Sequence, residues 1–176
     1  MWESFEVSLS IPGFVSVTGT WTPNRHERKA AWEMYVELIT RISVEEMRSG
    51  EGILRESLDS LYSIFDSTRV ILKKYGTVIA KPKKKNEVSF GFLSVVILNR
   101  VLRPFLTKWH PILEEYETRR AKNASVKEHE DKWELNSQMR TEMGEVRKVL
   151  VEYSYYLASI AKVTPLTGSV NRSNVG

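Results

Sequence analysis

The first two dozen residues alternate between apolar and polar side chains. Apolar residues occupy every second position, first as Phe5, Val7, Leu9 and Ile11 and then, after a turn at Pro12-Gly13, as Val15, Val17, Gly19 and Trp21. A period of two that is interrupted by a Pro-Gly turn predicts a β-hairpin with one apolar face over residues 1–22. Because an isolated hairpin is only marginally stable in water, this face must cover the rest of the chain, a second copy or a partner.

Two helical patterns follow the hairpin. Asn24 and Glu27 have the spacing of a capping box, and a start with Thr22 as the cap and Pro23 in the first turn is the alternative. The apolar stripe predicted for the first helix is Trp32, Tyr35, Val36, Ile39 and Ile42. The second helix carries Leu54, Leu58, Leu61, Phe65 and Leu72 at helical spacing, and Gly76 is placed to end it.

The third and fourth helical patterns are the longest. The third begins near Ser89, and its apolar stripe keeps its phase across Pro104 and Pro111, which favours one kinked helix, although each proline can instead start a new helix. The members of this stripe are Leu98, Val101, Leu102, Phe105, Trp109, Ile112, Leu113 and Tyr116. The fourth helix extends to about Lys162 with Trp133 first in its apolar stripe, and Ser125 and Glu128 have the spacing of a capping box at its start. Residues 117–132 between them are almost purely polar, so we expect the connected ends of these two helices to project as an antiparallel pair with a charged tip.

These patterns predict a mainly α protein, with an antiparallel four-helix bundle over residues 23–163 behind the hairpin. The tail from residue 164 to 176 is rich in Ser, Gly, Asn and Thr and is predicted to be disordered. At 176 residues the chain fits one domain. There is no cysteine, which excludes disulfides, thiolate nucleophiles and zinc sites with cysteine ligands.

The location of the protein is predicted from two further segments. Residues 1–6 are acidic and alternating, where a signal peptide would be basic and then continuously apolar. The longest apolar run, Val88 to Leu98, is about 11 residues long, and a membrane-spanning helix needs about 20. We therefore expect a cytoplasmic protein without a membrane span.

Positive charge is concentrated in one segment. The net charge of the chain is +4, and residues 73–85 contain six lysines and no acidic residue. The lysines at the end of this segment, Lys81, Lys83, Lys84 and Lys85, can give salt-sensitive binding to nucleic acid or another anionic surface. Aromatic residues do not interleave with these lysines, so the sequence does not predict a stacking platform for single strands.

Motifs of catalysis are not found at their required spacing. The three histidines lack the Glu-x-x-His pairing of di-iron bundles, and His26-Glu27 is not followed by the second histidine of a zinc protease. No glycine leads into a phosphate-binding Gly-Lys-Ser/Thr motif, and no serine has the glycines of a nucleophile elbow. We therefore predict no catalytic residue, no metal ligand and no cofactor.

One row of polar residues stands out on the third helix. At 100° per residue, Asn99, Arg103, His110 and Glu114 lie within a sector of about 60° beside the apolar stripe. Such a row can bind an anion or a carboxylate of a partner, and an enzyme acting on an anionic small molecule would place it against Arg103 and His110. The simpler interpretation is that Arg103 and Glu114 border the core with hydrated heads, while His110 caps a kink beside Pro111.

The function that these features favour is a non-enzymatic protein–protein interaction module. An apolar hairpin face and a projecting helical pair are surfaces that proteins seldom leave unused. The combination is typical of adaptors and regulatory accessory subunits of multi-protein systems, of the kind that prokaryotes encode in gene clusters. Self-association is one version of this prediction, and binding of nucleic acid or an anionic surface through the loop of Lys81 to Lys85 is the alternative function.

Overall fold

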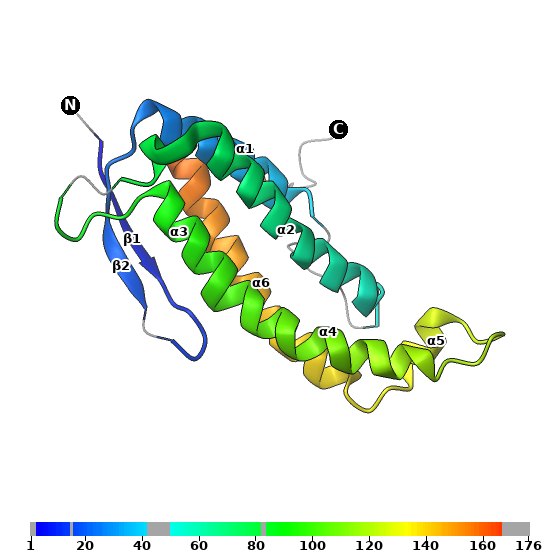
Figure 1. Ribbon diagram of the computed structural model, residues 1–176. Helices are drawn as coiled ribbons and strands as arrows, with labels where there is room; N and C mark the ends of the chain where they lie inside the picture. Colours follow the sequence, from blue (N-terminus) through cyan, green and yellow to red (C-terminus); the bar gives the residue numbers. More distant parts are fainter. Residues whose placement is uncertain (1–2, 15, 42–49, 82–83, 167–176) are drawn as a thin grey trace, which may run out of the picture.

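The computed structural model describes residues 3–14, 16–41, 50–81 and 84–166 of the chain. The protein is mainly helical, with a two-stranded antiparallel hairpin at its N-terminal end (Figure 1). The elements are β1 Phe5–Leu9, β2 Val17–Trp21, α1 Arg25–Ile39, α2 Leu54–Tyr75, the 3-10 turn η1 Gly76–Ile79, α3 Phe90–Val96, the π-helical segment η2 Ile97–Leu102, α4 Arg103–Thr118, α5 Val126–Asp131 and α6 Asn136–Ala161.

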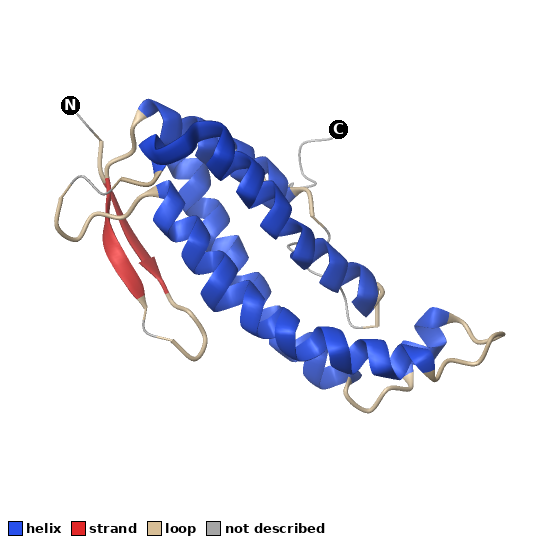
Figure 2. Ribbon diagram, in the orientation of Figure 1, coloured by secondary structure: helices blue, strands red, loops and turns tan. Residues whose placement is uncertain are grey.

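The hairpin covers the protein's own helices. Its strands pair in the register Phe5 to Trp21, and Figure 2 shows it, in red, alongside the helices. The residues of its apolar face that are at most 3% exposed are Val7, Leu9, Ile11 and Trp21. The hydroxyl of Tyr156 in α6 accepts a hydrogen bond from the Ser8 amide at 3.0 Å and donates one to the Ser8 carbonyl at 3.1 Å. These two bonds occupy part of the outer edge of β1. The predicted hairpin is confirmed, and its apolar face is not open to a partner; Val15 lies outside the described residues.

Helix α1 starts as predicted but is rotated relative to the predicted stripe. The side chain of Asn24 accepts hydrogen bonds from the amides of His26 and Glu27, and Glu27 accepts one from the Asn24 amide, which completes the capping box. The buried apolar side chains of α1 are Ala30, Ala31, Met34, Tyr35 and Leu38. Trp32 is 41% exposed, so its assignment to the core was wrong. Residues two apart are about 200° apart around a helix, so Trp32 and Met34 cannot both face the core.

The third helical pattern forms one continuous helix with a π-helical segment in the middle. Ser89 caps α3, as predicted, by accepting a hydrogen bond from the Phe92 amide at 3.2 Å. Pro104 has no amide hydrogen to donate, and in a regular α-helix its ring clashes with the carbonyl four residues earlier. The segment η2 ends at Leu102, just before this proline, and its wider π-helical turns relieve the conflict. Pro111 lies inside α4 without ending the helix. The predicted stripe is confirmed, because Val101, Leu102 and Trp109 are among its buried members.

The continuous helix Phe90–Thr118 is long and apolar enough, by length and composition alone, to cross a membrane. Of its most apolar window, 56% is buried inside the protein. The core helix of a protein that never meets a membrane passes the same test, so this finding does not decide the question. The absence of a membrane span stays a prediction.

The fourth pattern is divided into two helices. Ser125 caps α5 by accepting a hydrogen bond from the Glu128 amide, as its spacing predicted, but α5 ends at Asp131 and α6 begins only at Asn136, so a single helix from Ser125 to Lys162 was wrong. The end of α4, its loop and α5 extend beyond the start of α2 (Figure 1), but α5 is held to α4 because the Tyr116 ring stacks on His129 and Trp133 at 4.1 and 5.2 Å between centroids. At the other end of α6, the Leu166 amide donates to the Tyr35 hydroxyl, and residues 167–176 of the predicted disordered tail lie outside the described residues.

Helix lengths agree with the prediction that the third and fourth patterns are the longest. The continuous helix through α3, η2 and α4 has 29 residues and α6 has 26, against 22 for α2 and 15 for α1. Helix α1 packs against α6 and α2, and α4 packs against α2 and α6. Ile42, the last member of the stripe predicted for the first helix, lies outside the described residues. The residues that line the candidate site belong to the neighbouring helices α2 and α4.

Candidate functional site

A groove of about 600 Å³ lies between α2 and α4. We call it the α2–α4 groove. The helices run antiparallel along it, because Arg55 near the start of α2 reaches Glu117 near the end of α4, while Phe65 lies near Arg103 at the start of α4. The residues that line it are Asp59, Tyr62, Phe65, Arg69, Arg103, Leu106, Thr107 and His110.

Two guanidinium groups converge on the aromatic floor of this groove. The guanidinium carbons of Arg103 and Arg69 lie 5.2 and 5.5 Å from the centroid of the Phe65 ring. Arg69 also pairs with the exposed Asp66 at 2.9 Å, an interaction that solvent weakens. The Nε of Arg103 donates to the neutral side chain of Asn99 at 3.1 Å, and within the described part of the chain Arg103 forms no ion pair. Its positive charge is therefore available to a ligand.

His110 at the other end of the groove is held by a charged network. Its Nδ1 lies 3.1 Å from an Nη of Arg55, which also bonds both carboxylate oxygens of Glu117 at 3.0 and 2.6 Å. The hydrogen bonding that Arg55 donates to the Glu117 carboxylate, only partly offset by burial, raises the pKa of Arg55. Because an arginine can only donate, Nδ1 of His110 must accept, and the neutral ring carries its hydrogen on Nε2. The imidazole ring is thereby oriented as a donor beside the Tyr62 ring, whose centroid is 6.1 Å away.

The N-terminal end of α2 is docked onto α5 and α6. The carboxylate of Glu130, only 1% exposed, accepts hydrogen bonds from the amides of Leu54 at 2.9 Å and Arg55 at 3.4 Å, and so caps α2, whose own N-cap residue makes no side-chain cap. Burial raises the pKa of Glu130, although these amides act in the opposite direction. This contact was not predicted, because Glu130 was assigned to the charged tip.

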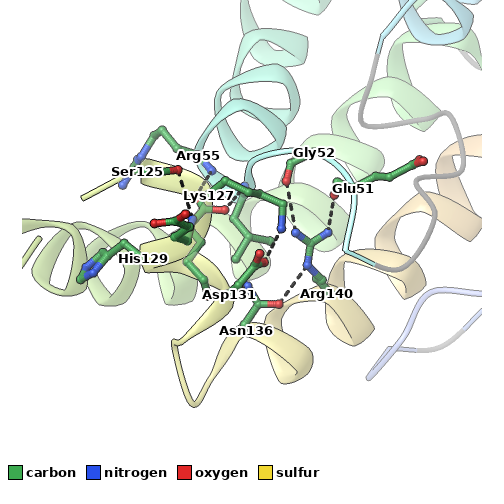
Figure 3. Close-up of polar contacts among 12 residues, drawn as sticks. Glu51, Gly52, Arg55, Ser125, Lys127, His129, Asp131, Asn136 and Arg140 are labelled. Atoms are coloured by element: carbon green, nitrogen blue, oxygen red, sulfur yellow. Dashed lines mark hydrogen bonds and ion pairs between the residues drawn. The ribbon is translucent and has the colours of Figure 1, made fainter. Parts of the chain in front are cut away.

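Arg140 of α6 completes this dock. Its guanidinium donates to the carbonyls of Glu51 and Gly52 at 2.9 and 3.3 Å and to the side chain of Asn136 at 3.0 Å (Figure 3). Asn136 in turn donates to the carbonyl of Glu130 at 2.8 Å. Because the Arg55 amide is bonded to Glu130 at this start of α2, the contacts of Glu130 and Arg140 position the Arg55 side chain, which holds His110.

The predicted polar row is brought together only in part. Asn99, Arg103 and His110 belong to the α2–α4 groove or bond to it, whereas Glu114 is exposed and does not line it. Sequence reasoning missed the contribution of α2, namely Tyr62, which is 54% exposed, and Arg69. Both lie within four residues of Phe65 on one helix, but only the pairing of α2 with α4 shows that they face Arg103.

The lysines of the predicted basic loop lie away from this groove. Lys81, Lys84 and Lys85 are exposed in the segment that follows η1, at the opposite end of α2 from Arg55 (Figure 1), and Lys83 lies outside the described residues. Asn86 ends this segment in a left-handed conformation, with φ of 66°, and its carbonyl accepts a hydrogen bond from the Thr20 amide at 3.1 Å. The hairpin thus holds the end of the loop.

Within the described part of the chain, no three histidine or carboxylate side chains gather as a possible metal site. The α2–α4 groove combines cations, one neutral imidazole and aromatic rings, which suits binding of an anionic and partly apolar ligand. No family model, curated protein or solved structure matches this chain.

Proposed function

We propose that this protein is a non-enzymatic protein–protein interaction module, an adaptor or regulatory subunit of a multi-protein system in the cytoplasm, and that the α2–α4 groove is its binding surface. The observation that carries the proposal is the convergence of Arg69 and Arg103 on the Phe65 ring beside the exposed Tyr62. Tyrosine and arginine are among the residues that contribute most to binding at protein interfaces. The buried hairpin face no longer supports binding through that element.

The chemistry of the groove specifies the occupant as a segment of another protein that carries carboxylates next to apolar side chains. Arg103 has no carboxylate partner among the described residues, and a planar guanidinium binds a carboxylate through two parallel hydrogen bonds. The rings of Tyr62 and Phe65 and the side chain of Leu106 offer the adjoining apolar contact. Asp59 at the far end would repel a second acidic group, which orients the segment with its carboxylate toward Arg103.

Photo-crosslinking from the groove tests this proposal. A benzoylphenylalanine replacing Thr107, an exposed residue of the groove lining, is expected to form an adduct with a partner in cells that naturally express the protein. Once that partner is identified and purified, Arg103→Ala should weaken its binding at least about tenfold, because the partner's carboxylate loses its charged donor. Isothermal titration calorimetry measures the change.

The controls lie on other faces of the molecule. The same photo-reactive residue at Thr141, exposed on α6, should not form this adduct, and Trp32→Ala on α1 should leave the affinity unchanged. Equal adducts from both positions, an adduct between two copies of this chain, or a partner that binds the Arg103→Ala variant as tightly as the wild type would each contradict the proposal.

A second candidate function is electrostatic binding of nucleic acid through the lysine loop, residues 81–85. The observation that favours it is that Lys81, Lys84 and Lys85 are exposed and form no ion pair with any described residue. Such a cluster binds phosphates and releases their condensed counterions, and because this release becomes less favourable as the salt concentration rises, the affinity depends steeply on salt.

Loss of the loop's charge is expected to abolish most of this binding. A fluorescein-labelled 12-nucleotide oligothymidine should bind the wild type at low salt, and replacing Lys81, Lys83, Lys84 and Lys85 by Ser should reduce the slope of log K against log salt by about 3. Fluorescence anisotropy over a salt series measures the slope. Binding that is unchanged by the substitutions would remove this candidate.

We also propose that the helices form an antiparallel four-helix bundle, as their pattern predicts. The pairwise packing of α1 with α6, α1 with α2, α2 with α4 and α4 with α6 supports this arrangement.

A further inference from the structure

A second groove, of about 550 Å³, lies where the start of α1 meets the end of α2. We call it the basic groove. It is lined by His26, Arg28, Lys29, Trp32, Glu33, Lys74, Tyr75 and Ala161. Trp32 is 41% exposed here, although it is one of the largest apolar side chains in the protein. An indole at the edge of an open groove presents a flat apolar surface to a ligand.

Cations surround this indole. Lys29 is exposed one turn before Trp32, and Lys74 reaches into the groove from α2. The one carboxylate of the lining, Glu33, pairs with Lys74 and accepts a hydrogen bond from the Tyr75 hydroxyl at 2.5 Å. Burial opposes ionisation of Glu33, but these hydrogen bonds lower its pKa, so it stays charged and holds Lys74 in place. With Arg28 and Lys29 added, the lining is net positive.

The basic groove is joined to the lysine loop. The side-chain amide of Asn24, the cap of α1, donates to the carbonyl of Val78 in η1 at 2.9 Å, and the His26 ring lies 6.4 Å from the Tyr75 ring. Lys81 follows Val78 by three residues, so it lies within about 11 Å of it along the chain. The exposed Trp32 and the exposed lysines after η1 therefore belong to the same end of α2, where the start of α1 contacts η1.

We infer that this end of the protein binds single-stranded nucleic acid, with one base stacked on Trp32, the adjacent phosphates on Lys29 and Lys74, and the strand continuing toward the exposed Lys81, Lys84 and Lys85. The inference rests on the second candidate function and adds to it a stacking site. A groove that combines cations with an exposed ring is the general form of sites for single strands, because every base has a flat face and every link a negative charge.

A single strand fits these features better than other polyanions do. In a duplex the base faces are stacked on one another, so Trp32 would add nothing to the binding. An anionic membrane would engage the lysines, but Trp32 is the one large apolar side chain of this lining that is exposed, so little apolar surface is available to insert into a bilayer. Only a strand with unpaired bases uses the indole and the cations together.

Oligothymidine binding by Trp32 variants of the full chain tests the inference. With the labelled 12-nucleotide probe, Trp32→Ala should weaken binding about tenfold while leaving the salt slope unchanged, because stacking is lost and no charge is removed. Trp32→Phe should restore most of the affinity, since it keeps an aromatic face. A duplex of the same length should bind the wild type and the Trp32→Ala variant equally.

Matched variants complete the experiment. Tyr62→Ala removes an exposed ring from the α2–α4 groove and should not change binding. Replacing the exposed Lys122 and Lys132 by Ser removes lysines from the other end of the protein and should have less effect than replacing those of the loop. If the lysine-loop variant loses binding and Trp32→Ala does not, the stacking site is refuted while the electrostatic candidate stands. If the wild type does not bind the oligonucleotide, or binds only anionic phospholipid vesicles, both are refuted.

Discussion

Replacing Glu27 by Ala is expected to lower the free energy of unfolding by about 3–5 kcal/mol. The Glu27 side chain is 3% exposed and accepts three hydrogen bonds, from the indole of Trp21 at 3.0 Å, the amide of Phe90 at 3.1 Å and the amide of Asn24 at 2.9 Å. Alanine would leave these donors without an acceptor at the junction of β2, α1 and α3. Urea denaturation followed by circular dichroism measures the loss.

The size of this effect is checked with two further variants. Glu27→Gln keeps one carbonyl acceptor but turns an amide group toward a donor, so its free energy of unfolding should fall between those of the wild type and Glu27→Ala. Glu114→Ala removes an exposed carboxylate from α4 and should change stability by no more than about 0.5 kcal/mol. A Glu27→Ala variant as stable as Glu114→Ala would show that the three hydrogen bonds do not hold the junction together.

Replacing Glu130 by Ala is the second large change, with an expected loss of about 2 kcal/mol in the free energy of unfolding. The substitution uncaps α2, because the amides of Leu54 and Arg55 lose their acceptor and Ile53 provides no side-chain cap. Exposed Glu128 on the same short helix is the control, and Glu128→Ala should cost at most about 0.5 kcal/mol. Similar losses for the two variants would contradict a capping role for Glu130.

The pH dependence of stability separates the charge of Glu130 from its hydrogen bonds. Burial raises the pKa of Glu130 in the folded protein above its ordinary value of 4.5, so from pH 4.5 upward the native state holds a proton that the unfolded state has released. The contribution of this group to stability therefore falls as the pH rises through that window. Glu130→Gln cannot titrate, and its stability relative to the wild type should increase from pH 4 to pH 7. A relative stability that decreases over this range would mean that the folded pKa is lowered.

The two proposed binding surfaces are separable along α2. The α2–α4 groove uses Tyr62, Phe65 and Arg69 in the middle of the helix, and the basic groove uses Lys74 and Tyr75 at its end. Each surface supplies the aromatic control for the other, so a variant that merely weakened the fold would reduce both activities. Under the two proposals, the protein partner and the nucleic acid would occupy different grooves.

Several elements of this fold are determined locally and were predicted from the sequence. The hairpin follows from alternation on either side of Pro12-Gly13, the start of α1 from the capping box of Asn24 and Glu27, and the start of α3 from Ser89. The end of α2 is also determined locally, because the φ angle of Gly76 is 65°, a value that suits glycine better than other residues. Hydrogen bonds and backbone preferences within a few residues decide such features, so neighbouring side chains are enough to predict them.

The tertiary structure alone decided which faces meet and therefore where ligands can bind. Periodicity assigned Trp32 to the core, but burial of Ala30, Ala31 and Met34 against other helices turned it outward. The charged sequence around Glu130 predicted an exposed tip, but its side chain is buried because it accepts a hydrogen bond from the Leu54 amide at the start of α2, which is distant in sequence. Arg69 and Arg103 meet at Phe65 only because α2 runs antiparallel to α4. A pattern along one helix specifies which residues are apolar, whereas the rotation of that helix and its partners depend on packing between segments far apart in the chain.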